Sequence, residues 1–236
     1  MNGCTPTWIP LHPTLVHFKD AMARPYFWDD VKNSLIIVAV TVVASMVLAF
    51  LAAVALAKYR FTGRKAFIVL MIGILMLPQA GLIIPLYVVL ARYHLTNTLI
   101  GVILTYMTFV IPFAVWTLRG FIVGIPKDLE EAAGIDGASR LGFFWRMVLP
   151  LSVPGLITVG ILAFIASWNS YLLPLFILND QDTFTLPLGV QAFSSQYSVD
   201  TAKVLAFTSL SMIPALVFFS LFERRIVGGL TGAVKG

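Results

Sequence analysis

The chain has 236 residues, of which 59% are hydrophobic and only 11% are charged. Soluble domains carry roughly 25% charged residues, so this composition excludes an ordinary soluble protein and indicates a membrane protein. The single cysteine, Cys4, excludes an intrachain disulfide and cannot complete a zinc site by itself. The net charge of +5 would suit nucleic acid as well as a membrane topology, so the placement of the basic residues has to decide between them.

Residues 1–33 precede the first long apolar run and are predicted to form an extracytoplasmic and interfacial segment. Met1–Pro10 has no basic start followed by an apolar run, so it is not a signal peptide. The aromatic residues Tyr26, Phe27 and Trp28 suit the boundary between lipid and water, where aromatic side chains gather. The segment is therefore expected to lie on the membrane rather than across it.

Five apolar stretches follow, and none of them contains Asp, Glu, Lys, Arg or His. A helix needs roughly 20 apolar residues to cross ~30 Å of hydrocarbon. The stretches are 34–57, 66–90, 99–118, 151–177 and 204–222. Pro78 and Pro85 interrupt the second stretch, which is either one span or a span followed by a short re-entrant or interfacial helix. The predicted fold is an all-α, polytopic transmembrane bundle of five spans, with the membrane domain at residues 34–222.

The basic residues then orient the spans. With the N-terminus outside, 11 of the 16 Lys and Arg residues fall on the inner side and 5 on the outer side. Basic residues concentrate in cytoplasmic segments. Residues 223–236 are therefore predicted to be a cytoplasmic tail. Topology explains the positive charge, and no nucleic-acid partner is predicted.

The long inner loop, residues 119–149, carries the most informative pattern. Pro126 at a first helical position, with Asp128 and two glutamates in the following turn, starts a helix well. Gly137 permits a bend after it, and Ser139 can cap a second short helix with an apolar face. Two short helices set at an angle under the membrane suit docking into a groove of a partner.

At this loop the chain resembles a known family. Glu131-Ala132-Ala133, followed at fixed spacing by Gly137, Met147 and Leu149-Pro150, is similar to the EAA motif of ATP-binding-cassette (ABC) importer permeases, with Met147 at the usual isoleucine position. The run from Glu130 to Ala138 resembles the carbohydrate-uptake, maltose-permease branch. Further matches are Asn33-Ser34, the stretch 168–175 and the C-terminal stretch 228–236.

The resemblance implies a function and a set of partners. The chain would be a multi-pass permease in the cytoplasmic membrane of a prokaryote, translocating a di- or oligosaccharide. It would be no enzyme and bind no cofactor or metal, with ATP and Mg²⁺ held by two partner ATPase subunits. A second permease, an extracytoplasmic substrate-binding protein and membrane lipid would complete its surroundings. The family normally has six spans, so a first helix is expected to be missing from this chain.

The resemblance also implies which residues contact the ATPase. The loop would be a coupling helix seated in a cleft of that subunit. Its coupling residues would be Glu130, Glu131, Ala132, Ala133, Asp136, Gly137, Leu149 and Pro150.

A second group of polar and aromatic residues is a candidate for the sugar path. Trp168, Asn169 and Tyr171 lie in an otherwise apolar stretch, and Gln79 and Tyr106 lie in two others. Aromatic faces and amides suit polyhydroxylated ligands, but a buried amide such as that of Asn169 can equally bond a neighbouring helix. On a continuous helix Trp168 and Tyr171 share a face and Asn169 does not, so all three reach one pore only if the helix unwinds toward Pro174.

Other functions are weighed against these patterns. A permease for glycerol phosphates or another polar solute is the nearest alternative. A secondary transporter usually places an ionisable residue within a span, and none of the five has one. A non-transporting membrane assembly factor would leave the spaced motif unexplained. Thr62-Gly63-Arg64-Lys65 lacks the upstream glycine and following hydroxyl of a phosphate loop. The three histidines, His12, His17 and His94, have no metal-like spacing.

Overall fold

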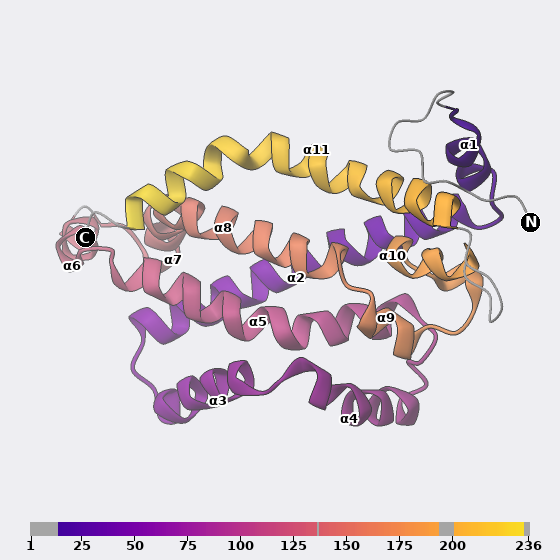
Figure 1. Ribbon diagram of the computed structural model, residues 1–236. Coiled ribbons are helices and arrows are strands. Elements are labelled where there is room, and N and C mark those ends of the chain that lie inside the picture. Colours follow the sequence, from indigo (N-terminus) through magenta and orange to yellow (C-terminus); the bar gives the residue numbers. More distant parts are fainter. Residues whose placement is uncertain (1–13, 136, 194–200, 234–236) are drawn as a thin grey trace, which may run out of the picture.

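The computed structural model describes residues 14–135, 137–193 and 201–233. The described residues form helices and loops without a strand. Four long helices run side by side along the molecule: α2 (Phe27–Lys58), α5 (Leu99–Val123), α8 (Leu149–Trp168) and α11 (Thr201–Ala233) (Figure 1). Within the part described, four helices are long and apolar enough to cross a membrane, or five if a bent pair counts as one. The predicted all-helical membrane fold is confirmed.

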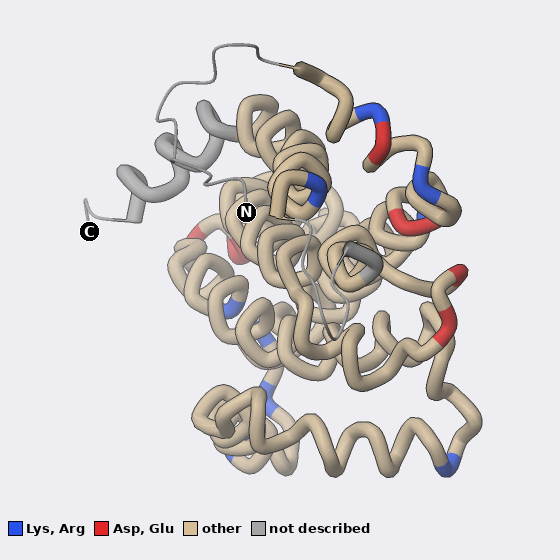
Figure 2. The backbone as a smooth tube through the Cα atoms, turned by 45° about the vertical axis from the view of Figure 1, so that its right-hand side comes forward, with Lys and Arg blue, Asp and Glu red and all other residues tan. Residues whose placement is uncertain are grey.

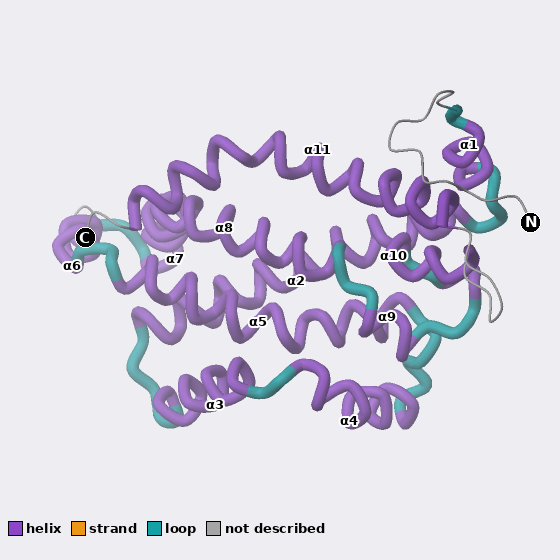
Figure 3. The backbone as a smooth tube through the Cα atoms, in the orientation of Figure 1, coloured by secondary structure: helices purple, strands orange, loops and turns teal. Residues whose placement is uncertain are grey.

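The second predicted span is broken. It consists of α3 (Arg64–Met76) and α4 (Gln79–Arg92), and the chain bends by 109° from one to the other. Figure 3 shows the loop between them. Pro78 has no N–H to give to a helix and drives the residue before it out of the helical region, and Leu77 accordingly has φ −78° and ψ 129°. The interruption expected at Pro78 is therefore present, and one straight span over 66–90 is excluded.

The fourth predicted span differs from its predicted extent. The stretch 151–177 is not one helix, because α8 ends at Trp168 and α9 (Leu172–Ile177) follows after three non-helical residues. Pro174 cannot donate a hydrogen bond to the carbonyl of residue 170, as a continuous helix would require. The chain therefore turns before the proline, and α9 packs against α5 and α4 instead of prolonging α8.

Small residues allow the central helices to pack closely. The core between α2, α5 and α8 contains Ala49, Ala53 and Ala114, each fully buried. A Cβ added at Gly155 of α8 would lie 2.8 Å from the Phe121 ring of α5, so this crossing requires glycine. Small residues at such contacts are typical of membrane helices, which gain little from the hydrophobic effect when they associate.

The outward faces of the helices are apolar. Val43 and Leu51 on α2 and Val69 on α3 are more than half exposed, and most of the apolar window of α11 is open. Charges lie at the helix ends: in Figure 2 the tube of α3 and α4 carries no charge between the basic residues at its two ends. Such faces are typical of helices covered by lipid or by other subunits.

Two short helices lie beside the ends of the bundle. Helix α1 (Val16–Met22) packs against α11 at one end. There the Lys203 ammonium nitrogen lies 3.8 Å from a carboxylate oxygen of Asp20. Helix α10 (Leu186–Gly189), preceded by η2 (Gln181–Thr183) and followed by η3 (Val190–Phe193), lies at the same end and packs on α2. The opposite end carries α6 (Lys127–Ile135) and α7 (Arg140–Phe143). Helix α11 continues past residue 222, so its backbone joins the predicted span to the predicted tail without a break.

Candidate functional site

Helix α6 has acidic and small residues exposed on the surface of the molecule. It begins directly after Pro126, with Asp128 and Glu130 in its first turn, as the sequence predicted. Glu131 and Ala132 are exposed and Ala133 is partly buried. Leu129 points inward and packs against the core of α2, α5 and α8. The helix therefore lies at the end of the bundle, with Leu129 toward the core and exposed residues on its outer surface.

The bend after α6 is a Schellman motif built on Gly137. This residue has φ +75°, a left-handed conformation that glycine adopts without strain. The Ala138 amide donates to the Ala133 carbonyl at 2.9 Å and the Gly137 amide to the Gly134 carbonyl at 3.1 Å, which is the hydrogen-bond pair of that motif. Asp136, also predicted to act in this loop, lies outside the described residues.

The second half of the loop is continuous with a long helix. The Ser139 hydroxyl accepts from the Gly142 amide at 3.1 Å and caps α7 as expected. The chain then passes through a π-helical turn, η1 (Phe144–Val148), directly into α8, where Leu149 and Pro150 form the first turn. The sequence predicted a separate short helix here. The structure instead makes it the extension of the span.

One ion pair joins this loop to α2. The Lys58 ammonium donates to the Glu130 carboxylate at 3.1 Å, and it lies 5.7 Å from the centre of the Phe143 ring in α7. Lys58 is the last residue of α2, 72 positions before Glu130. Lys58 was not predicted as a functional residue, because the sequence shows only a basic residue at the end of a span and not its partner Glu130.

One cavity of about 400 Å³ lies at the other end of the bundle. It is lined by the candidate path residues Trp168, Asn169 and Tyr171, by Gln191, and by residues of α11 that include Thr208. The break after α8 brings them together, which a continuous helix would have prevented. The Tyr171 hydroxyl accepts a hydrogen bond from the Gln191 amide at 3.0 Å.

The three side chains have different surroundings. Trp168 is buried, stacks on Phe164, and donates from its indole nitrogen to the Ser211 carbonyl of α11 at 3.1 Å. Asn169 is exposed and donates to the Ile165 carbonyl of its own helix at 3.2 Å. The bond to a neighbouring helix that was considered for Asn169 is thus made by Trp168, and Asn169 and Tyr171 remain open to the cavity.

The other two candidate path residues lie elsewhere. Gln79 is exposed at the first position of α4, beside the bend at Pro78. Tyr106 is 3% exposed and packs in a core cluster with Ile37, Val102 and Leu173. Neither lines the cavity at Tyr171.

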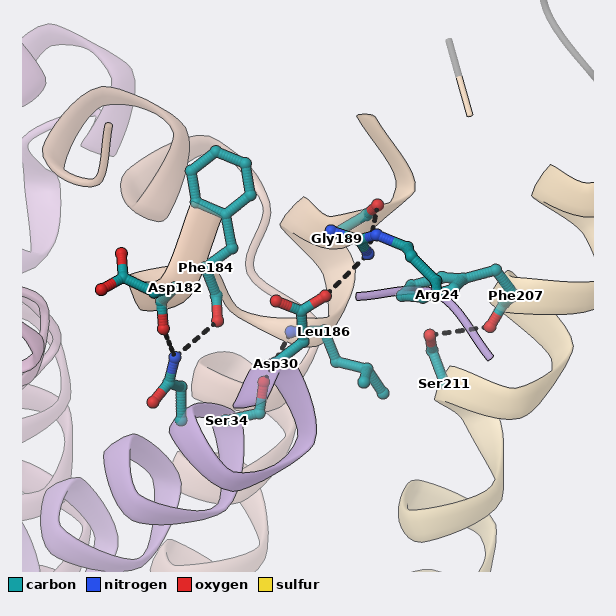
Figure 4. Close-up of polar contacts among 10 residues, drawn as sticks. Arg24, Asp30, Ser34, Asp182, Phe184, Leu186, Gly189, Phe207 and Ser211 are labelled. Atoms are coloured by element: carbon teal, nitrogen blue, oxygen red, sulfur yellow. Dashed lines mark hydrogen bonds and ion pairs between the residues drawn. The ribbon is translucent and has the colours of Figure 1, made fainter. Parts of the chain in front are cut away.

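A buried polar cluster near this cavity was not predicted from the sequence (Figure 4). The Arg24 guanidinium donates to the Asp30 carboxylate at 2.8 Å and to the Gly189 carbonyl at 2.9 Å. Asp30 is fully buried in the first turn of α2, and the Arg24 guanidinium carbon lies 5.6 Å from the centre of the Phe207 ring of α11. The sequence showed that Asp29 and Asp30 are adjacent, but it did not show that Arg24 pairs with Asp30.

The loop 178–186 is held by side chains from distant parts of the chain. The Asn33 amide donates to the carbonyls of Asp182 and Phe184 at 2.8 and 3.1 Å. The Ser34 hydroxyl accepts from the Leu186 amide at 2.7 Å, as Figure 4 shows. Asn97 holds the same loop, because its side-chain oxygen accepts from the backbone amides of Asn179 and Asp180 at 2.9 and 3.1 Å.

Comparison with known proteins adds to this geometry. The family model described as "Binding-protein-dependent transport system inner membrane component" matches residues 45–227. The diacetylchitobiose uptake system permease protein DasC of Streptomyces coelicolor is 39% identical over 232 residues, 98% of this chain and 84% of that protein. The arabinooligosaccharides transport system permease protein AraQ of Halalkalibacterium halodurans is 37% identical over 100% of this chain and 84% of that protein.

A solved structure shares the fold. It is a bacterial ABC transporter involved in the import of the acidic polysaccharide alginate, with a TM-score of 0.79 and 22% identity over 92% of this chain and 81% of that one.

Among the described residues, no group of three or more His, Cys, Asp or Glu side chains is placed to hold a metal ion.

Proposed function

The chain belongs to the family of binding-protein-dependent transport inner membrane components, and from this premise we propose that it imports a neutral di- or oligosaccharide. It is a carbohydrate ABC importer permease, a multi-pass transport component and not a catalytic subunit. The observation that carries the proposal is the match, along nearly the whole chain, to two permeases named for uncharged sugars. The absence of charged residues from all five apolar stretches supports a neutral substrate.

The substrate class is tested by uptake. The chain is reconstituted in proteoliposomes with its partner permease, ATPase subunits and binding protein. ATP-dependent uptake is measured for diacetylchitobiose, for arabinooligosaccharides and, as an acidic comparison, for alginate oligosaccharides. We expect uptake of a neutral sugar. Uptake of the acidic sugar alone would contradict the proposal and favour the alternative of a charged solute.

The loop around α6 is the contact with the ATPase subunits in this proposal. Glu131 and Ala132 are exposed and lie next to the bend at Gly137, so they are free to enter a cleft of a partner. Two ATPases close on ATP and Mg²⁺, the loop moves with them, and the spans of this chain and of a second permease shift as rigid bodies. Leu149 and Pro150 transmit the movement, since they join the loop to α8.

The cavity at Tyr171 is part of the sugar path in this proposal. Tyr171→Ala removes an open aromatic face that packs against the apolar side of a sugar ring, at a cost of roughly 1 kcal/mol, or about a fivefold loss of uptake. Stimulation of ATP hydrolysis by the binding protein should be retained. Tyr93→Ala is the matched control, because Tyr93 is exposed at the end of α4 and does not line the cavity. Equal uptake by both variants would remove Tyr171 from the path.

The orientation is part of the same proposal: the loop 178–186 faces the binding protein outside, and α6 faces the cytoplasm. In a Cys4→Ser background, Gln181→Cys should react with a membrane-impermeant maleimide added to intact cells, and Lys65→Cys should not. Both positions are exposed in the fold, so accessibility to the reagent reports the side of the membrane. The reverse labelling pattern would invert the topology.

A further inference from the structure

Helix α6 is joined to α7 by the bend at Gly137. Gly137 is left-handed, and a Cβ added at Gly134 or Gly137 would meet no atom within 4 Å. Beyond the bend, α7 runs through η1 into α8 without interruption. The two Schellman hydrogen bonds fix the backbone of the bend locally, but within the part of the chain described no side chain packs against either glycine to hold α6 and α7 at one angle.

Lys58 contacts both sides of that bend. Its ammonium pairs with Glu130 of α6 at 3.1 Å and lies over the Phe143 ring of α7. The Lys58 side chain is 13% exposed and that of Glu130 is 50% exposed. A partly buried ammonium between a carboxylate and an aromatic face is attracted to both, so it favours one angle between the two helices.

Among the described residues, α6 makes few other contacts with the end of α2. Lys58 and Glu130 are among the residues that line two cavities, of about 280 and 440 Å³. The space beside the ion pair is therefore open. Within the described part of α6, Leu129 supplies the apolar contact with the core. The Lys58–Glu130 ion pair joins α6 to α2, although the two residues are 72 positions apart in the sequence.

We propose that Lys58 is a positioning residue for energy coupling. Its ion pair with Glu130 and its contact with Phe143 set the angle of α6 against α7, and they make α2 follow α6 when the partner ATPases close. This inference rests on the proposed function of α6 as the coupling helix. It adds α2, which packs against both α5 and α8, as a second element through which movement of the loop reaches the bundle.

Charge reversal tests the pair. In the reconstituted importer, Lys58→Glu and Glu130→Lys should each lower the stimulation of ATP hydrolysis by the binding protein about threefold, as expected when a partly exposed ion pair becomes a like-charge pair. The swapped double variant should restore most of the stimulation. Lys65→Glu, which makes the same charge change at an exposed position of α3 at the same end, should leave it unchanged. The amount of assembled complex should be equal in all four.

The outcomes separate the pair from general effects. Unchanged stimulation in both single variants, or loss that the swap does not restore, would overturn the proposal. If a reversed charge prevents assembly, Lys58→Met retains the apolar stem and is measured instead, with the same loss expected and full stimulation contradicting it. The readout is ATP hydrolysis and not uptake, so a wrong assignment of the sugar leaves the test intact.

Discussion

Gly137→Pro is expected to abolish sugar uptake while the protein still inserts and assembles with its partners. Proline fixes φ near −65°, whereas Gly137 has φ +75°. It also removes the amide that bonds the Gly134 carbonyl in the Schellman motif. A conflict of this kind costs about 3 kcal/mol or more, enough for more than a tenfold loss if the loop must keep its shape to couple.

Two control variants make this result specific. Gly134→Ala changes a helical glycine three residues earlier whose added Cβ meets nothing, so uptake should stay normal. Gly137→Asn should retain much of the uptake, since asparagine tolerates the left-handed region better than other residues with a side chain. Uptake, complex yield and ATP hydrolysis are measured for each. Wild-type uptake by Gly137→Pro would show that the bend has no part in coupling.

Gly189→Ala is expected to destabilise strongly the end of the bundle that carries α1 and α10. The added methyl group would overlap the Asp30 carboxylate and come within 2.8 Å of the Arg24 guanidinium and 2.9 Å of the Phe207 ring. The buried Arg24–Asp30 pair would have to separate, and breaking a buried ion pair costs about 3–5 kcal/mol. Thermal unfolding in detergent should therefore occur at a clearly lower temperature than in the unmodified protein.

The matched control for this change is Gly120→Ala. An added Cβ at Gly120 in α5 meets no atom within 4 Å, so the variant should unfold at the normal temperature or slightly above it, because alanine favours the helix. Equal unfolding temperatures for the two variants would mean that the side chains around Gly189 rearrange without a loss of stability.

The sequence by itself determined the features that depend on neighbouring residues. The lengths of the apolar stretches predicted the membrane helices, apart from the extent of the fourth. Pro78 predicted the break between α3 and α4, and Pro126 with the acids after it predicted the start of α6. The bend at Gly137 and the cap by Ser139 were also predicted. Each of these depends on the geometry of a few consecutive residues, which proline, glycine and capping side chains restrict strongly.

Only the tertiary structure decided which distant residues meet. Lys58 and Glu130 are 72 positions apart, and Arg24 and Gly189 are 165 apart. The sequence showed their types but not their partners. The end of α8 at Trp168 was missed for the same reason, because an apolar stretch with a proline continues or breaks according to what it packs against. Trp168 and Asn169 were both candidates for the sugar path, and packing against α11 buried Trp168 and left Asn169 open to the cavity.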